Sequence, residues 1–251
     1  MKILAAIIAL TLIPAASFGA NNKTAQSKKQ SAPQEISVRT PDGWLLRGTY
    51  YPGKAGSPLI LLMHKLGSNR SEFTGLAKAL NARGCNVLAY DARGHGESTM
   101  LDGKNVTYES FSDKDFENMT IDIDSVLKYL RQKGVGKGEV GLVGASIQSS
   151  TGLIYAAKHP EVKALVLLSP GLSYHNIDTT RPMKEYGARP VFMAASTEDE
   201  ASYESVKTLE QLAAGPKKTV ILTDAGHGAQ MFQKDPKLLL QVTDWLSANL
   251  K

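Results

Sequence analysis

The amino-acid sequence predicts an α/β fold in which helices cover both faces of a mostly parallel, eight-stranded sheet. Short apolar runs of strand length recur along the chain, and segments with the spacing of amphipathic helices lie between most of them. Apolar strands that alternate with helices in this way are typical of a parallel sheet buried on both faces. Because no internal repeat interrupts the alternation, we expect one folded domain.

The strands follow one another from residue 35 onward. Ile36–Thr40 and Trp44–Tyr51 flank the tripeptide P-D-G at 41–43, a turn sequence, and this predicts an antiparallel pair at one sheet edge. Buried strands are predicted at six further apolar runs, Leu59–Met63, Asn86–Tyr90, Glu139–Val143, Ala164–Leu168, Val191–Ala195 and Thr219–Leu222.

Helical spacing of apolar residues is found between most of these strands. The predicted helices are Ser71–Arg83, Phe116–Gln132, Ser146–Lys158, Ser202–Ala213 and Lys237–Asn249. The segment 171–190, between two of the buried strands, is too short for an independent cap domain. We therefore expect a minimal cap and an open site.

The first twenty residues have the pattern of a secretory signal peptide. Lys2 gives a positive start, an apolar run follows to Ile13, and the small residues Ser17 and Gly19 suit a cleavage site. The run is shorter than the roughly 20 apolar residues that a stable anchor needs. We expect a signal peptide at 1–20, a flexible polar linker at 21–34 and the folded domain at 35–251. The product is then exported to a periplasm or secreted, without a stable membrane anchor, and an uncleaved anchor is the alternative.

Composition and motifs exclude several kinds of partner. The net charge is +5, but Lys2, Lys23, Lys28 and Lys29 carry four of those charges, so the rest of the chain offers no nucleic-acid surface. The single cysteine excludes an intramolecular disulfide and a cysteine-based metal cluster. Neither H-E-x-x-H, nor a P-loop, nor G-x-G-x-x-G occurs. We expect no metal and no cofactor, and a small-molecule partner.

A serine lies where a predicted strand turns into a predicted helix. Residues 144–148 read G-A-S-I-Q, and the strand Glu139–Val143 ends immediately before them. A serine at such a sharp turn is exposed at the carboxyl edge of the sheet, and the helix behind it offers backbone N–H groups to a developing oxyanion. Ser146 is therefore the candidate nucleophile, although a serine in this position can also be a simple helix cap.

An acid and a histidine follow two other strands, at the same edge of the sheet. Asp199 comes after the strand that ends at Ala195, and His227 after the strand that ends at Leu222. Ser146, Asp199 and His227 together predict a catalytic triad with the histidine as general base. The neighbouring acids Glu198, Glu200 and Asp224 are alternatives for Asp199.

Two backbone N–H groups are predicted to form the oxyanion hole. One belongs to Ile147, directly after the candidate nucleophile, and the other to Leu66, in the loop after the strand Leu59–Met63. His64 begins that loop, and we expect it to hydrogen-bond the loop rather than to transfer protons.

With these residues placed, the sequence resembles the α/β-hydrolase superfamily from Glu35 to Leu250, and within it the small esterase, monoacylglycerol-lipase and serine-aminopeptidase-like group. Residues 91–98 read D-A-R-G-H-G-E-S and match the family's D-x-R-G-H-G-x-S loop, and residues 224–228 read D-A-G-H-G, similar to its histidine loop. The resemblance implies that 35–251 is an α/β-hydrolase domain and that Asp91, Arg93 and His95 have a structural role.

The chain departs from the family pattern at two positions. The family's H-G-x-G is H-K-L-G at 64–67, so that Lys65 stands where glycine is usual. Gln148 stands where G-x-S-x-G has its last glycine, and a side chain of that size could distort the turn or fill the space under it.

Three functions remain open on the sequence alone. The first is a serine hydrolase that cleaves carboxylic esters of small or medium acyl groups through an acyl-enzyme. The second is a peptidase or amidase with the same triad, which usually needs an acidic pocket for a peptide terminus. The third is a binding protein that keeps the fold without turnover, which Lys65 and Gln148 would favour.

Overall fold

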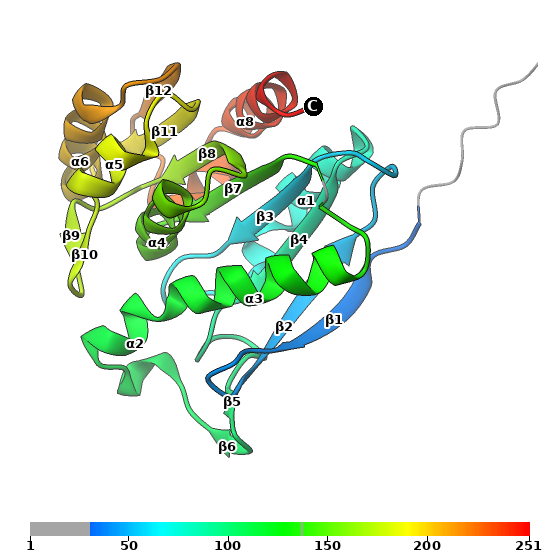
Figure 1. Cartoon of the computed structure of the whole chain (residues 1–251). Helices are drawn as coiled ribbons and strands as arrows, with labels where there is room; N and C mark the ends of the chain where they lie inside the picture. Colours follow the sequence, from blue (N-terminus) through cyan, green and yellow to red (C-terminus); the bar gives the residue numbers. More distant parts are fainter. Residues whose placement is uncertain (1–30, 137) are drawn as a thin grey trace, which may run out of the picture.

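The computed structural model describes residues 31–136 and 138–251 (Figure 1). The predicted signal peptide, 1–20, and the predicted linker as far as residue 30 lie outside the described residues. The first strand, β1 (Gln34–Arg39), begins one residue before the expected start of the domain. Export and cleavage of the leader therefore stay predictions.

One large sheet runs through the molecule, with the strand order β12-β11-β8-β7-β3-β4-β2-β5-β6 and with β1 paired to β2. All eight predicted strands are present, and the short strands β5 and β6 bring this sheet to ten in the described part of the chain. The bounds after β1 are β2 (Trp44–Tyr51), β3 (Leu59–Met63), β4 (Asn86–Asp91), β5 (Met100–Leu101), β6 (Lys104–Asn105), β7 (Val140–Ala145), β8 (Val162–Leu168), β11 (Val191–Ser196) and β12 (Lys217–Leu222).

The central strands run parallel, and the edge that contains β1 and β2 does not. The six strands β3, β4, β7, β8, β11 and β12 form the parallel part. β1 pairs antiparallel with β2, and β2 pairs antiparallel with β4. This is the arrangement that the apolar runs and the P-D-G turn predict.

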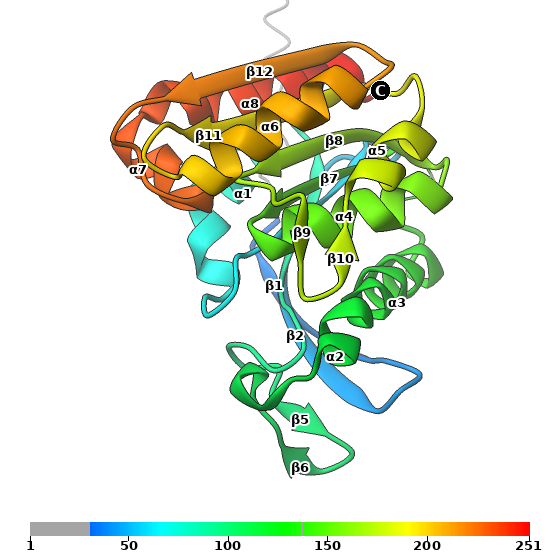
Figure 2. The same ribbon diagram turned by 90° about the vertical axis from the view of Figure 1, so that its left-hand side faces the viewer.

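Helices form a layer on each face of the sheet (Figures 1 and 2). One layer contains α3 (Met119–Gln132), α4 (Ile147–Lys158), α5 (Thr180–Tyr186) and α6 (Glu200–Leu212). The other contains α1 (Thr74–Ala82) and α8 (Pro236–Asn249), with the single turn α7 (Met231–Lys234) beside it. The predicted helix Phe116–Gln132 is divided at Asn118, which separates α2 (Asp113–Glu117) from α3.

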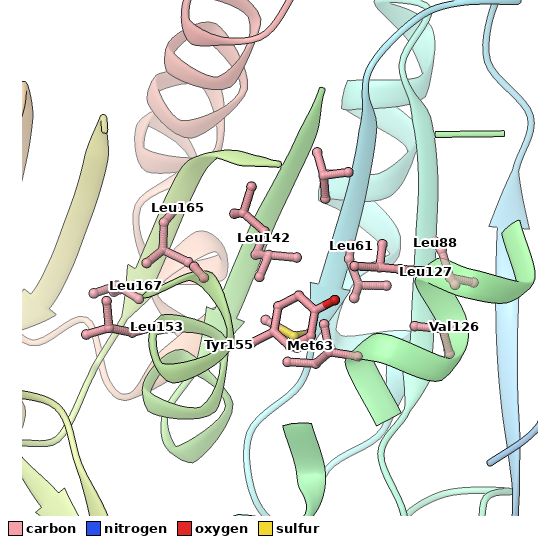
Figure 3. Packing of buried hydrophobic residues seen from close by; sticks show 14 of the residues in the cluster. Leu61, Met63, Leu88, Val126, Leu127, Leu142, Leu153, Tyr155, Leu165 and Leu167 are labelled. Carbon is pink, nitrogen blue, oxygen red and sulfur yellow. The ribbon is translucent and has the colours of Figure 1, made fainter. Parts of the chain in front are cut away.

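Each face of the sheet contributes to its own hydrophobic core. Along β3, Leu59, Leu61 and Met63 belong to the cluster under α3 and α4, whereas Ile60 and Leu62 belong to the cluster under α1 and α8. Successive side chains of a strand point to opposite faces, so a strand buried on both sides must be apolar throughout. Figure 3 shows the first cluster, in which Leu61 and Leu142 of adjacent strands lie among side chains of the covering helices.

The strand order reverses at β3, and this places the site. The chain passes from β3 to β4 on one side and then returns to β7 on the other side of β3. In open α/β sheets a crevice forms outside the carboxyl ends of the two strands at such a reversal. The loops that follow β3 and β7 therefore meet there, and they contain Leu66 and Ser146 respectively.

The segment 171–190 folds as a small hairpin and one short helix. The hairpin consists of β9 (Ser173–Tyr174) and β10 (Ile177–Asp178), which pair only with each other, and α5 follows it. The sequence pattern predicts no element here, because strands of two residues are too short for any periodicity to be visible. The cap is minimal, as expected.

Candidate active site

Ser146 occupies a strained turn between β7 and α4. Its backbone has φ 56° and ψ −128°, in a region that L-residues rarely adopt, and its N–H donates to the carbonyl of Leu168 at 2.8 Å. Gly144 makes the turn possible, since a Cβ at that position would lie 2.5 Å from the carbonyl oxygen of Gln148. The first glycine of the motif is therefore required by the close approach of α4 to β7.

The side chain of Gln148 packs against α3. It is buried at 1% exposure and extends toward Met119, to whose sulfur the amide Nε2 donates at 3.2 Å. The Oε1 atom of Gln148 has no hydrogen-bond partner in the described part of the chain. The side chain thus fills space beneath the turn at the cost of one buried, unsatisfied acceptor.

His227 and Asp199 form a close pair. The Nδ1 atom of His227 lies 2.6 Å from Oδ2 of Asp199, and both side chains are partly exposed. A carboxylate next to Nδ1 keeps the proton on that nitrogen, so Nε2 is left free to accept one. In the described residues the Ser146 hydroxyl makes no hydrogen bond to His227, and such contacts are often long in a site without substrate.

Glu198 holds the loop that contains His227. Its carboxylate accepts hydrogen bonds from the Ser196 hydroxyl at 2.5 Å, the Asp224 N–H at 2.9 Å and the Gly226 N–H at 2.7 Å. These hydrogen bonds, of which the one from Ser196 has the largest effect, lower the pKa of Glu198 to about 2. The Ser196 hydroxyl also accepts from the Ala225 N–H at 2.9 Å, which ties the ends of β11 and β12 together.

The structure thereby gives different contacts to the four acidic residues that the sequence left as candidates for the triad acid. Asp199 is the acid that contacts His227, Glu198 binds the backbone of the histidine loop, and Glu200 is exposed at the first position of α6. Asp224 contributes its N–H to Glu198 and has a left-handed backbone with φ 51°. Only the hydrogen-bond geometry could assign these roles, because the four acids lie within a few residues of β11 or β12.

Leu66 and Ile147 line the same pocket as Ser146 and His227. The loop that carries Leu66 is fixed by His64, whose Nδ1 donates to the Lys65 carbonyl at 2.8 Å and whose Nε2 accepts from the Ala92 N–H at 3.0 Å. The hydrogen bond that Nε2 accepts needs neutral imidazole, and burial lowers the pKa of His64 to about 4. His64 hydrogen-bonds the loop as expected.

The Lys65 side chain turns away from the pocket. A Cβ on Gly228 would lie 3.6 Å from its Cδ, so the stem of Lys65 covers the histidine loop, and its ammonium lies 4.0 Å from Glu72. The backbone N–H of Lys65 also donates to Glu72 at 3.3 Å. The side chain that replaces the usual glycine is thus not among the residues that line the pocket around Ser146.

Buried ion pairs and a ring stack fix the loop after β4, beside the candidate site. Arg93 is buried at 1% exposure and its guanidinium contacts two carboxylates, Asp122 at 2.8 Å and Asp42 at 2.7 Å. Asp91 pairs with Arg70, and the His95 ring stacks on Tyr108 at 4.3 Å. These contacts give Asp91, Arg93 and His95 the structural roles that the family resemblance implies.

The pocket around Ser146 has a volume of about 410 Å³. Hydroxyl groups from several elements border it, and its titratable side chains in the described residues are Asp199 and His227, apart from the exposed phenol of Tyr174. Ser169, to which no sequence pattern pointed, follows β8 directly and accepts from the Gly228 N–H at 2.9 Å. The remaining lining residues are Leu66, Ile147, Ser150, Gly171, Leu172, Ser173, Ala201, Ser202 and Ser205.

A larger hollow of about 590 Å³ lies between α3 and α4, beyond the hairpin β9–β10. It contains His159 and Asp124 but none of Ser146, Asp199 and His227, so its size does not make it the site of the chemistry. No cluster of potential metal ligands is found among the described residues. Within the same residues, no helix combines the length and the apolar character needed to cross a bilayer.

Sequence comparisons relate the chain to hydrolases. The family model described as serine aminopeptidase, S33, matches residues 56–238. A thiohydrolase of Aspergillus aculeatus, aneE, is 27% identical over 138 residues, which are 54% of this chain and 41% of that protein. The mouse sn-1-specific diacylglycerol lipase ABHD11 is 32% identical over 111 residues, which are 44% of this chain and 31% of the lipase. The matched part therefore spans less than half of either relative.

Solved structures show the same fold over most of the chain. The esterase Pf2001 of Pyrococcus furiosus superposes with a TM-score of 0.71 at 18% identity and covers 88% of this chain and 91% of its own. A dienelactone hydrolase of Anabaena variabilis gives a TM-score of 0.69 at 19% identity, with 88% of this chain and all of its own covered. At these identities the likeness establishes the α/β-hydrolase fold.

Proposed function

The chain belongs to the serine aminopeptidase S33 family of α/β-hydrolases, and from this premise we propose that it is an exported serine esterase for small or medium acyl groups. The observation that carries the proposal is the pairing of His227 with Asp199 at 2.6 Å in the pocket that Ser146 borders. A nucleophile, a base and an orienting acid on three separate strand ends are the parts that acyl transfer needs.

In the proposed mechanism Ser146 attacks the ester carbonyl and His227 Nε2 takes its proton. The carbonyl oxygen becomes an oxyanion, which the N–H groups of Leu66 and Ile147 stabilise. His227 then returns the proton to the leaving alcohol, and the acyl group remains on Ser146. Water, activated by the same histidine, releases the acid, while Asp199 keeps the imidazole oriented throughout.

The pocket favours an uncharged ester over a peptide. A peptidase that removes N-terminal residues needs an acidic group for the substrate's ammonium, and the acid in the described lining is Asp199, which already pairs with His227. A cavity of about 410 Å³ suits a substrate of small or medium size. The match to a thiohydrolase adds acyl thioesters to the substrates worth assaying, since the same acyl-enzyme would form.

The decisive experiment measures hydrolysis of p-nitrophenyl acetate, butyrate and octanoate by the mature protein and by Ser146→Ala. Loss of the nucleophile from a working triad is expected to lower kcat by roughly 10³-fold or more. Ser150→Ala is the matched control, since this serine lines the same pocket from α4, the helix that follows Ser146, and its hydroxyl donates to the Gly171 carbonyl at 3.3 Å.

Parallel assays separate the remaining functions. Turnover of aminoacyl anilides in preference to esters would replace the esterase proposal by the peptidase. If wild type hydrolyses none of these substrates and a fluorophosphonate does not label Ser146, the protein is a binding protein on a hydrolase fold. Export is tested on the full-length chain in its native host, by the mass of the mature N-terminus in the exported fraction.

A further inference from the structure

The hairpin β9–β10 is too small to be stable by itself. Tyr174 pairs with Ile177 across a two-residue turn, in which His175 and Asn176 have φ values of 49° and 59°. Positive φ at both central positions defines a type I′ turn, the geometry that suits a two-residue hairpin. Because an isolated hairpin is at best marginal in water, contacts with other elements must fix its position.

His175 supplies the main contacts at the tip. Its Nδ1 lies 2.7 Å from Oδ1 of Asp113, and its ring stacks on Phe116 with centroids 4.0 Å apart and planes at 16°. Both partners belong to α2, which lies outside the large sheet. Ile177, on the next strand of the hairpin, is buried in the cluster that Phe116 and Met119 form with Ile147. The hairpin is therefore docked on α2 through one hydrogen bond, one ring stack and one apolar side chain.

The two strands of the hairpin face different cavities. Ser173 and Tyr174 line the pocket around Ser146, whereas Asn176 and Ile177 line the larger hollow of about 590 Å³ between α3 and α4. Figure 2 shows the hairpin extending beside α4 toward α2 and α3. The hairpin is thus a thin wall between the catalytic pocket and a second space that is larger than the pocket itself.

We propose that this hairpin is the size-selecting wall of the site, and that His175 is the positioning residue that holds it closed. The proposal rests on the esterase function inferred above and adds the class of substrate, an ester whose uncharged acyl arm is short enough to end at Tyr174. Tyr174 is 52% exposed, so the tyrosine itself has little packing to hold it and depends on the docked tip. Undocking the tip joins the pocket to the outer space and lets a longer arm bind.

Two substitutions test the wall without disturbing the core. His175→Asn removes the ring stack and the pairing geometry but keeps the turn, because asparagine favours positive φ at this position of a type I′ turn. Tyr174→Ala removes the wall residue itself and leaves His175 in place. We expect each to raise the ratio of kcat/KM for p-nitrophenyl octanoate to that for the acetate by about tenfold or more, because a hydrophobic pocket already discriminates roughly tenfold for a single methylene.

Matched controls distinguish a size-selecting wall from a general loosening of the fold. Tyr174→Phe keeps the ring and is expected to keep the wild-type ratio. His159→Asn makes the same substitution at another histidine that stacks on a tyrosine, Tyr155 at 3.8 Å, and pairs with an acid, Glu161 at 3.3 Å, but is not on the hairpin. Hydrogen exchange of the amides in 173–178 should speed up in His175→Asn and stay as in wild type in His159→Asn.

The outcomes distinguish failure of the size-selecting wall from failure of the esterase proposal on which it rests. Turnover of acetate by wild type, with an octanoate-to-acetate ratio that neither His175→Asn nor Tyr174→Ala changes, would overturn the size-selecting wall and leave the esterase intact. A ratio that rises equally in His159→Asn would overturn it as well. Absence of turnover in wild type would remove the esterase proposal and the wall together.

Discussion

The loop after β4 and the hairpin after β8 both support the candidate site, yet opposite kinds of contact hold them. In the loop, Arg93 is buried between Asp122 and Asp42, and it lies with Asp91 within the motif that the family resemblance rests on. In the hairpin, the contact at the tip is a partly exposed pair between His175 and Asp113. Removing one partner from a buried charge pair costs about 3–5 kcal/mol, whereas an exposed pair costs little to break. We therefore expect the frame of the candidate site to be rigid and the proposed wall of the pocket to be adjustable.

The largest expected effect comes from breaking the buried network. Arg93→Ala leaves Asp122 as an uncompensated buried charge, which should lower the free energy of unfolding by about 3–5 kcal/mol. Urea unfolding followed by circular dichroism measures this change. Arg131→Ala, which breaks a partly exposed pair with Glu161, is the control and should cost less than about 1 kcal/mol. Equal losses in the two variants would show that the loop is no more rigid than the surface.

A smaller effect is expected from loosening the histidine loop. Glu198→Gln weakens the acceptor that holds the N–H groups of Asp224 and Gly226, and His227 should lose its alignment with Ser146. On the proposed mechanism kcat should fall on the order of 10- to 100-fold while KM changes little, because misplacement affects the reaction more than binding. Glu200→Gln is the control at the neighbouring acid. An unchanged kcat in Glu198→Gln would mean that the loop holds its geometry without the clamp.

Acid should weaken the fold through the buried histidines beside the site. The pKa of His64 is about 4 in the fold against a usual 6.5, so between these values the unfolded chain binds a proton that the folded chain does not. Stability is therefore complete above pH 6.5 and should fall by about 1.4 kcal/mol per unit as the pH drops toward 4. His95, whose pKa burial also lowers, adds to the same slope.

Unfolding at a series of pH values between 7 and 4.5 measures that slope. The matched variant is His64→Gln, which can still hydrogen-bond but does not titrate, and its slope should be shallower by about one proton. If His64→Gln and wild type have the same slope, the imidazole of His64 is already charged in the fold.

Sequence patterns alone predicted the frame and the location of the candidate site. Apolar runs showed where the strands lie because a strand buried on both faces must be apolar throughout its length, as β3 is. The carboxyl ends of parallel strands meet at one edge, so the residues after β7, β11 and β12 could be grouped by their positions in the chain. Local spacing is enough for such statements, since strand and helix periods are local properties.

Contacts between side chains, in contrast, follow only from the packing of the whole chain. Spacing favoured Asp199 but left Glu198 open as the partner of His227, because the two are adjacent and differ only in direction. It could not say that Gln148 lies under the turn toward Met119, or that Lys65 covers the histidine loop. Sequence patterns did not predict the hairpin β9–β10, because its strands have only two residues each. Its position depends on contacts with α2, which is far away in the sequence. Hydrogen bonds and ring stacks are decided within a few ångströms, and only the packed chain brings distant residues that close.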